Sequence, residues 1–458
     1  MRIHFIAIGG SAMHNLAIAL KKRGYIVSGS DDEIFEPSRT RLSNYGLLPE
    51  ATGWFPEKLD SRPDAVILGM HARADNPELK RAADLGIRIY SYPEYLYEHS
   101  KEKTRVVIGG SHGKTTITAI LLHILKHAGI DADYMVGAQL EGFDVMVKLS
   151  DRARLMILEG DEYLTSAIDR RPKFHVYRPH LALLSGISWD HINVFPTWEG
   201  YREEFIKFIN LIEPGGSLVY CTDDEEVVKV VNESGNKITK MPYGLPAHII
   251  RKGITLLEGD GRQIPLKVFG RHNLVNIEGA RKLCHQLGVG DNEFYSAIGS
   301  FPGASNRLEL ISQNENTAVF RDFAHSPSKL KATVEAVGEQ FPERHLAACM
   351  ELHTFSSLST NFLEYYKGTL DGAGTPMVYF NPHTLELKRL PSLSPEMVRR
   401  AFACPELRVY TDSGKLVNDL LSMGWKNRNL LMMSSGNFNN INFADLTGRI
   451  TGGIAGRE

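Results

Sequence analysis

Short apolar runs alternate with segments of helical periodicity along the chain. Residues 4–9 are mostly apolar and predict a buried strand, and apolar residues recur at helical spacing over residues 13–23. Two more apolar runs, at 25–28 and 65–68, predict further strands. A strand, a helix and a strand at this spacing predict a βαβ unit with a parallel sheet.

The same alternation occurs twice more. A second block opens with an apolar run at 105–108, a glycine turn and a helical pattern at 115–127. The remaining candidates are strands at 155–158, 181–184 and 216–220, then strands at 317–321, 377–380 and 430–433 and a helix at 328–339. We therefore predict three α/β domains in series, residues 1–103, 104–300 and 301–458, because 458 residues exceed what one hydrophobic core usually holds.

The composition is that of an ordinary globular protein. Hydrophobic residues make up 43% and charged residues 23%, and the net charge of −2 argues against a nucleic-acid or anionic-membrane partner. No apolar stretch approaches the roughly 20 residues of a membrane span. The cysteines are scattered without metal-ligand spacing, at Cys221, Cys284, Cys349 and Cys404. This pattern favours reduced thiols and a cytoplasmic location.

The sharpest chemical signal is a glycine-rich turn between a predicted strand and a predicted helix. It reads Gly-Gly-Ser-His-Gly-Lys-Thr-Thr over residues 109–116. Backbone N–H groups in such a turn and the helix dipole bind phosphate, and a following lysine and hydroxyl contact the phosphates and Mg²⁺. The predicted nucleotide-binding residues are Gly110, Ser111, His112, Gly113, Lys114, Thr115 and Thr116. The general phosphate-loop pattern requires a glycine where the chain has Ile108, and this turn alone would also fit a kinase, a motor or a GTPase.

Four further motifs follow one another in a distinctive order. They are Ala-Ile-Gly-Gly-Ser-Ala-Met at 7–13, Leu-Glu-Gly-Asp-Glu at 158–162 with Trp-Asp-His at 189–191, Gly-Arg-His-Asn at 270–273 with Asn276, and Asn-Arg at 306–307 with Asp-Phe-Ala-His-Ser-Pro at 322–327. Together with the short phosphate loop, they resemble the Mur ligase family, and most closely its UDP-N-acetylmuramate branch. The resemblance implies a Rossmann-like first domain that binds UDP-N-acetylmuramate, a central P-loop domain that binds ATP, and a Rossmann-like third domain that binds the amine substrate.

The resemblance assigns the first motif to the UDP pyrophosphate. Gly9, Gly10 and Ser11 would contact it, although Ala7 and Ala12 replace two glycines of the family pattern. Asp31 follows the second strand, where dinucleotide-binding folds place an acid for a ribose hydroxyl. A cap of a helix or turn is an equally open role for Asp31.

The acidic motif maps onto the family's metal ligands. The resemblance makes Glu159, together with Thr115, a ligand of the Mg²⁺ that bridges ATP and substrate, and His191 a ligand of a second metal. Hard oxygen ligands after a strand suit Mg²⁺, which takes few protein ligands. A solvated acidic loop is the alternative. Phe205 stands where other branches carry a carbamylated lysine, which favours the muramate branch.

The last two motifs concern the rest of the nucleotide. The resemblance assigns Asn273 and Asn276 to the adenine, with a helix-capping turn as the alternative. It assigns Arg307 and Asp322 to phosphate and ribose, with an ion pair and a helix cap as the alternative. The chain departs from the family pattern by having Asn306 for an arginine, Arg321 for an aspartate and Ser326 for a histidine.

The implied activity is ATP-dependent formation of an amide through an acyl phosphate. The implied catalytic residues are Lys114, Glu159, His191 and Arg307. Two amine substrates occur in the muramate branch, L-alanine and the tripeptide L-alanyl-γ-D-glutamyl-meso-diaminopimelate, which is used in peptidoglycan recycling. Residues 169–179 and 190–196 are similar to the tripeptide-adding members, which we favour, with the L-alanine activity as the alternative. A weakened nucleotide-sugar-binding protein and a P-loop kinase are alternatives from other classes, and no nucleic acid, membrane or protein partner is implied.

Overall fold

The first 103 residues form a four-stranded parallel sheet with helices around it. The sheet has the order β2-β1-β3-β4, so the first strand lies in its interior. The strands are β1 (Arg2–Ile6), β2 (Ile26–Ser30), β3 (Ala65–Leu68) and β4 (Ile89–Ser91), and the helices are α1 (Ser11–Lys22), α2 (Ser38–Asn44), the 3₁₀ helix η1 (Pro56–Ser61), α3 (Pro77–Asp84) and α4 (Tyr92–His99). The predicted βαβ unit at the start of the chain is therefore confirmed.

The structure, a computed structural model, describes all residues except 138, 141–142, 191–193, 306 and 453–458. The chain divides into two compact units, Met1–Gly244 with Asn276–Ala297 and Leu245–Val275 with Ile298–Glu458. The first unit holds the four-stranded sheet and a seven-stranded sheet. The second unit holds a three-stranded and a six-stranded sheet.

The seven-stranded sheet has the order β11-β10-β9-β5-β8-β6-β7 and is parallel except for its edge strand β7. Its strands are β5 (Thr104–Gly109), β6 (Ala132–Met135), β7 (Val147–Lys148), β8 (Leu155–Gly160), β9 (Leu181–Leu184), β10 (Ser217–Cys221) and β11 (Thr239–Tyr243). The accompanying helices are α5 (Lys114–His127), α6 (Lys173–Val176), α7 (Trp198–Asn210), α8 (Glu225–Glu233), α9 (Arg271–Gln286), which runs on from the second unit, and α10 (Asp291–Ile298).

The register of this sheet brings three loops to one edge. Gly109 at the end of β5 lies opposite Gly160 of β8 and Leu184 of β9. The loops that follow these strands therefore start side by side. Ligands of parallel α/β sheets bind at this carboxyl edge.

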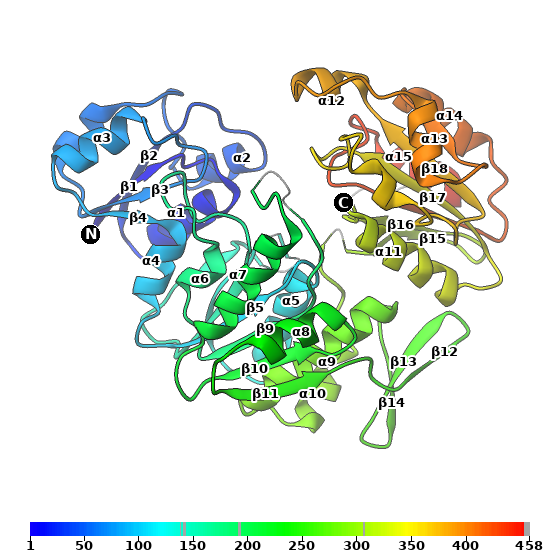
Figure 1. Cartoon of the computed structure of the whole chain (residues 1–458), viewed down its shortest axis with the longest axis horizontal. Helices are drawn as coiled ribbons and strands as arrows, with labels where there is room; N and C mark the ends of the chain where they lie inside the picture. Colours follow the sequence, from blue (N-terminus) through cyan, green and yellow to red (C-terminus); the bar gives the residue numbers. More distant parts are fainter. Residues whose placement is uncertain (138, 141–142, 191–193, 306, 453–458) are drawn as a thin grey trace. The chain divides into compact units, whose positions relative to one another are not determined.

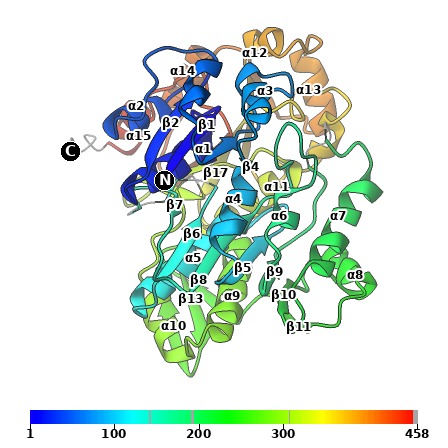
Figure 2. The ribbon, with the colours of Figure 1, turned by 90° about the vertical axis from the view of Figure 1, so that its left-hand side faces the viewer.

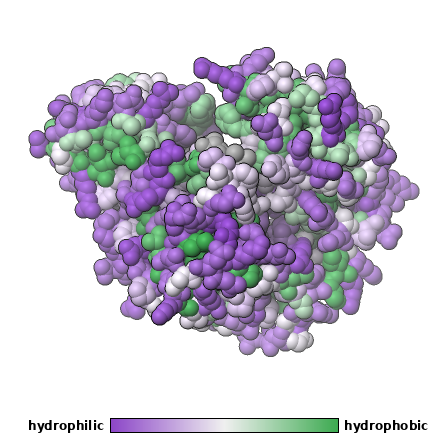
Figure 3. Space-filling model, viewed as in Figure 1, coloured by the Kyte–Doolittle hydropathy of each residue, from purple (hydrophilic) through white to green (hydrophobic). Residues whose placement is uncertain are grey.

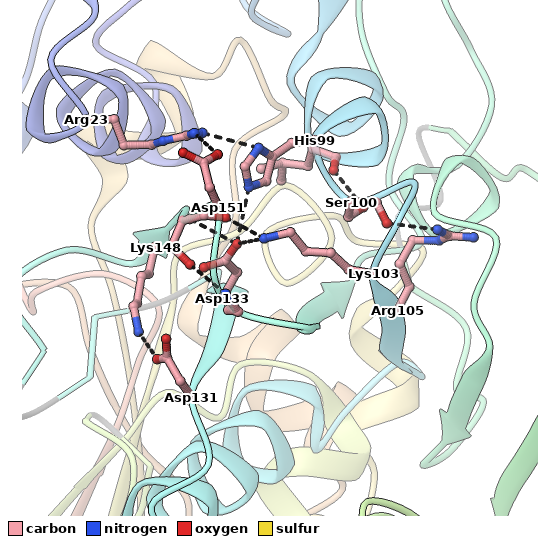
Figure 4. A network of polar contacts seen from close by, with 12 residues as sticks. Arg23, His99, Ser100, Lys103, Arg105, Asp131, Asp133, Lys148 and Asp151 are labelled. Atoms are coloured by element: carbon pink, nitrogen blue, oxygen red, sulfur yellow. Dashed lines mark hydrogen bonds and ion pairs between the residues drawn. The ribbon is translucent and has the colours of Figure 1, made fainter.

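A polar network fixes the connection from α4 to β5 against the seven-stranded sheet (Figure 4). Asp133 of β6, whose side chain is fully buried, accepts hydrogen bonds from His99 Nε2 at 3.2 Å and Lys103 Nζ at 2.5 Å. The guanidinium of Arg105 donates to the carbonyl of Ser100 at 2.9 Å. In Figure 1 and Figure 2, α4 lies between the four-stranded sheet and α6.

The second unit contains a mixed sheet of order β15-β16-β20-β17-β18-β19, in which only the edge strand β15 is antiparallel. Its strands are β15 (Glu309–Gln313), β16 (Ala318–Asp322), β17 (His345–Leu352), β18 (Thr375–Phe380), β19 (Arg408–Tyr410) and β20 (Arg428–Met433). The helices are α11 (Pro327–Gln340), η2 (Leu363–Tyr366), α12 (Pro382–Leu387), α13 (Pro395–Phe402), α14 (Ser413–Ser422) and α15 (Phe443–Thr451).

A small antiparallel sheet from the middle of the chain also belongs to the second unit (Figure 1). It comprises β12 (His248–Arg251), β13 (Ile254–Gly259) and β14 (Arg262–Pro265). Gln340 of α11 holds it, since its amide donates to the carbonyl of Gly253 at 2.6 Å and accepts from Thr255 Oγ1 at 2.8 Å. The domain boundaries at 103/104 and 300/301 stay a prediction.

The face of the molecule in Figure 3 is mostly hydrophilic, and its apolar areas are separate patches. None of the helices in the described part of the chain is long and apolar enough to cross a membrane.

Candidate active site

The phosphate loop connects β5 to α5, as the sequence predicted. Gly110 and Gly113 have φ angles of +132° and +80°, which side chains other than hydrogen rarely permit. The space around them is also closed. A Cβ atom on Gly110 would lie 2.2 Å from Ser185 Oγ, and one on Gly113 would lie 2.5 Å from Asn276 Oδ1. Both glycines are required by conformation and by packing.

The loop is bonded to the segment that follows β9. The N–H of Ser111 donates to the carbonyl of Gly186 at 2.8 Å, and the N–H of Ser188 donates to Ser111 Oγ at 2.9 Å. The hydroxyl of Ser185 donates to the carbonyl of His112. A Cβ on Gly186 would lie 1.9 Å from the His112 ring. The glycine at 186 therefore lets this ring lie against the backbone.

Lys114 opens helix α5 and its ammonium group lies against the acidic loop that follows β8. Nζ donates to the carbonyl of Gly110 at 2.6 Å and to Glu162 Oε2 at 2.5 Å. Burial lowers the pKa of Lys114, but the negative charges of Glu162 and Asp161 outweigh it and leave the pKa raised. The lysine is therefore positively charged at neutral pH, as binding of phosphate requires.

Thr115 and Glu159 meet at the same edge of the sheet. Thr115 Oγ1 donates to Glu159 Oε1 at 2.8 Å, and the N–H of Gly137 donates to Glu159 Oε2 at 2.9 Å. Two oxygen ligands at right angles on Mg²⁺, each about 2.05 Å from the ion, are about 2.9 Å apart. The pair therefore fits adjacent positions on Mg²⁺. Among the described residues no group of three His, Cys, Asp or Glu side chains could hold a metal ion.

A second lysine contacts the acidic loop. Lys173, the first residue of α6, donates to Asp161 Oδ2 at 2.5 Å and lies 5.7 Å from the centre of the Tyr92 ring. Burial lowers the pKa of Lys173, and the charge of Asp161 more than compensates. The acidic motif is thus no solvated loop: Glu159 and Glu162 are 7% and 2% exposed and both are engaged by other side chains.

The structure brings together the residues predicted for the UDP pyrophosphate and ribose. The N–H of Gly9 donates to Asp31 Oδ2 at 2.7 Å, Gly10 precedes α1 as its N-cap residue, and Ser11 is the exposed first residue of that helix. Burial raises the pKa of Asp31 above its ordinary value. Ala7 has φ of +67°, which explains why the family pattern has a glycine there.

Arg307 and Asp322 also lie close together. Asp322, at the end of β16, accepts the N–H groups of Leu308 at 2.5 Å and Ala324 at 2.6 Å. Burial raises its pKa, and the nearby positive charge of Arg307 opposes that shift. Ser326 is the N-cap residue of α11 but makes no side-chain capping bond.

Two predicted asparagines lie one turn apart on α9. The amide of Asn273, the third residue of α9, donates to the carbonyl of Phe269 at 2.9 Å. Asn276 instead lies against Gly113 of the phosphate loop. His191 and Asn306 lie outside the described residues, so their roles stay predictions.

Comparisons with known proteins decide the family. Residues 2–104 match the model described as Mur ligase family, catalytic domain, and residues 108–283 match the Mur ligase middle domain. The UDP-N-acetylmuramate–L-alanine ligase of Sulfurihydrogenibium sp. (strain YO3AOP1) is 31% identical over 373 residues, which cover 80% of this chain and 80% of the relative. The chain belongs to the Mur ligase family.

This Mur ligase is therefore an ATP-dependent ligase that forms a C–N bond and releases ADP and phosphate. The UDP-N-acetylmuramate–L-alanyl-γ-D-glutamyl-meso-2,6-diaminoheptandioate ligase of Haemophilus influenzae is a further relative, 29% identical over 74% of this chain and 76% of its own length.

Solved structures confirm the three-domain α/β fold of this Mur ligase. A murein peptide ligase from Psychrobacter arcticus superposes with a TM-score of 0.65 and 22% identity, over 98% of this chain and 99% of its own. A UDP-N-acetylmuramate-alanine ligase from Thermotoga maritima gives a TM-score of 0.70 and 21% identity, over 96% and 97%.

Three residues of the site were not predicted from the sequence of this Mur ligase. They are Glu162, Lys173 and Tyr201. The hydroxyl of Tyr201 contacts both Ser111 and Glu162. Glu162 and Lys173 lie within the motifs used, but their partners are distant in sequence. Tyr201 lies four residues before Phe205, and helical spacing places it on the same side of α7.

The described part of this Mur ligase also contains a cavity of about 730 Å³ between α4 and the α6–α7 segment. It shares no lining residue with the phosphate loop or the acidic loop. Two of its arginines pair with glutamates of the same lining, Arg171 with Glu94 at 3.4 Å and Arg88 with Glu98 at 3.7 Å. The predicted site residues of the first unit therefore lie at the loop edge of the sheet and not around this cavity.

Proposed function

We propose that this Mur ligase joins L-alanyl-γ-D-glutamyl-meso-diaminopimelate to the lactyl carboxylate of UDP-N-acetylmuramate, in peptidoglycan recycling. The observation that carries the proposal is the link between the acidic loop and β9. Residues 169–179, which resemble the tripeptide-adding ligases, supply α6 and with it Lys173, which is bonded to Asp161 of the acidic loop. Residues 169–179, whose sequence favours the tripeptide-adding ligases over the L-alanine ligases, thus contribute a contact to the acidic loop of the site.

The chemistry begins with an unreactive carboxylate, which must be activated before an amine can attack it. The muramate carboxylate attacks the γ-phosphate of ATP, which gives an acyl phosphate and ADP. Lys114 and the loop N–H groups stabilise the charge that spreads over the transferring phosphoryl group. Thr115 and Glu159 would hold Mg²⁺, which would supply further positive charge there. The amine then attacks the acyl carbon, and the tetrahedral intermediate expels phosphate.

The other predicted contacts complete the proposal. Gly9, Gly10, Ser11 and Asp31 bind UDP-N-acetylmuramate, and His191 supports a second metal ion. Asn273, Asn276, Arg307 and Asp322 contact the nucleotide. With no membrane-spanning helix in the described chain and with nucleotide substrates, we propose a cytoplasmic location.

The amine is proposed to bind at the carboxyl edge of the six-stranded sheet. Glu351, 3% exposed at the end of β17, accepts the N–H of Phe438 at 2.8 Å and the hydroxyl of Ser434. This carboxylate fixes the turn after β20 beside the loop after β17. A tripeptide with several carboxylates needs such an extended, preformed edge, whereas L-alanine needs only a small pocket.

A second candidate is the L-alanine ligase of the same branch. It is favoured by the names of several relatives, among them a 29% identical UDP-N-acetylmuramate–L-alanine ligase of Aquifex aeolicus (strain VF5) that matches over 80% of this chain.

An amine comparison separates the two candidates. With UDP-N-acetylmuramate and ATP fixed, we expect kcat/KM for the tripeptide to exceed that for L-alanine at least about tenfold, or about 1.4 kcal/mol of transition-state discrimination. Binding of the remote carboxylates of the tripeptide helps to orient its amine at the reacting centre. A dipeptide that lacks the third residue should therefore show lower turnover as well as lower affinity. If L-alanine is the better amine, the tripeptide assignment is wrong and the second candidate replaces it.

A further inference from the structure

One buried carboxylate joins two parts of the phosphate loop. The side chain of Glu162 is 2% exposed. Its Oε2 accepts a hydrogen bond from Lys114 Nζ at 2.5 Å, and its Oε1 accepts one from the Tyr201 hydroxyl at 3.3 Å. A carboxylate at this depth is stable only when its charge and its lone pairs are satisfied. Here one oxygen is bonded to Lys114 of the loop, and the other is bonded to Tyr201, which contacts Ser111 of the loop.

The second branch continues to the loop backbone. The Tyr201 hydroxyl lies 2.7 Å from Ser111 Oγ, which also accepts the N–H of Ser188 at 2.9 Å. Only one arrangement of hydroxyl protons satisfies all of these bonds with an ionised Glu162. Ser188 N–H donates to Ser111, Ser111 O–H donates to Tyr201, and Tyr201 O–H donates to Glu162. The whole chain is therefore oriented by the negative charge at its end.

We propose that Glu162 is the positioning residue of the phosphate loop, which orients Lys114 directly and Ser111 through Tyr201. The inference rests on the proposed assignment of residues 110–116 to the phosphates of ATP. A lysine ammonium has three N–H donors. Gly110 O and Glu162 fix two of them, which directs the third toward a phosphate oxygen. Glu162 itself need not touch the nucleotide.

The carboxylate also supplies a buried counter-charge to the lysine, whose side chain is 13% exposed. Glu162→Gln preserves the size of the side chain and removes the charge. We expect kcat/KM for ATP to fall at least about tenfold. The KM for UDP-N-acetylmuramate should stay unchanged, because Glu162 acts on the phosphate loop.

Tyr201→Phe separates the two branches. It removes one hydrogen bond to Glu162 and leaves the ion pair, so we expect a loss of only about two- to fivefold. Glu78→Gln is the matched control. Glu78 is a fully buried carboxylate of the first domain, paired with His4 at 3.2 Å, and its replacement should affect thermal stability without changing kcat/KM for ATP.

The double variant Lys114→Met/Glu162→Gln tests coupling. If Glu162 acts mainly through Lys114, the double variant should be worse than Lys114→Met alone by no more than the two- to fivefold loss expected for the Tyr201 branch. If Glu162→Gln does not fold because Lys114 loses its counter-charge, the double variant should fold again. An additive loss, an unchanged kcat/KM for ATP in Glu162→Gln or a double variant that stays unfolded overturns the proposal. If Lys114→Met itself turns over normally, the assignment of the phosphate loop fails instead.

Discussion

The oxygen atoms of Thr115 and Glu159 lie 2.8 Å apart although 44 positions separate the two residues in the chain. Both were predicted as metal ligands, each from its own motif. Their proximity follows from the register of β5 and β8, which puts Gly109 opposite Gly160. By contrast, no motif marks Tyr201, because its importance depends on a contact with Ser111 across 90 positions. Single residues of the site could be predicted where a local pattern carries the chemistry, and could not where only the fold creates the contact.

Replacements at Thr115 test the metal assignment. Thr115→Val keeps the shape of the side chain and removes the oxygen, so we expect the Mg²⁺ concentration for half-maximal rate to rise at least about tenfold. Thr115→Ser keeps the oxygen and should stay near the wild type. Mg²⁺ titrations of the initial rate measure both. Equal behaviour of the valine and serine variants would show that the hydroxyl is no metal ligand.

At the scale of elements, strands with a strong apolar pattern were predicted and others were missed. Beyond the first residues of β5 and β8, the strands β5, β8 and β9 are continuous runs of buried residues, which is typical of parallel sheets covered on both faces. β17, an eight-residue interior strand, was missed because His-Leu-Ala-Ala-Cys-Met-Glu-Leu is poor in β-branched residues. The small sheet at 248–265 was also missed, and its hydrogen bonds to Gln340 join residues 85 positions or more apart, which no local pattern reveals.

The two ends of α5 offer a matched pair of glycine replacements. Gly113 before the helix and Gly129 after it have φ of +80° and +70°, so alanine is strained at both, by about 1 kcal/mol. A Cβ at Gly129 meets nothing within 4 Å, whereas one at Gly113 lies 2.5 Å from Asn276 Oδ1. We expect Gly129→Ala to lower stability by that strain alone and to leave the KM for ATP unchanged.

Gly113→Ala should in addition displace Asn276 or the loop, and raise the KM for ATP at least about tenfold, or 1.4 kcal/mol. Thermal melts and ATP titrations of the two variants give the comparison. If both variants change the KM for ATP equally, the effect comes from the helix and not from the loop.

At the scale of the whole molecule, the connection between the first two sheets depends on a buried charge cluster (Figure 4). Lys103 and Asp133 are 9% and 0% exposed, and Asp133 also accepts the N–H of Ser150 at 3.0 Å. Its Oδ1 has no hydrogen-bond partner among the described groups. A buried pair that loses one partner leaves the other charge uncompensated. The cluster therefore makes the attachment of the linker to β6 sensitive to a single carboxylate.

Asp133→Asn should lower the free energy of unfolding of the first unit by about 3 kcal/mol at pH 7, because Lys103 loses its counter-charge. Burial acts to raise the pKa of Asp133, but its bonds to His99, Lys103 and Ser150 outweigh this and leave the pKa below the ordinary value of an aspartate. A carboxylate with a depressed pKa contributes stability above its unfolded pKa, and the contribution disappears as the pH falls through the folded pKa. The difference between wild type and variant should therefore be constant from about pH 5 to 8 and shrink below about pH 4. Urea unfolding at a series of pH values measures this difference.

Asp151→Asn, in the same network but 84% exposed, is the control and should lower the free energy of unfolding by less than about 1 kcal/mol. A loss for Asp133→Asn that is as small as that for Asp151→Asn, or that does not depend on pH, would mean that the linker is held by packing and not by the carboxylate.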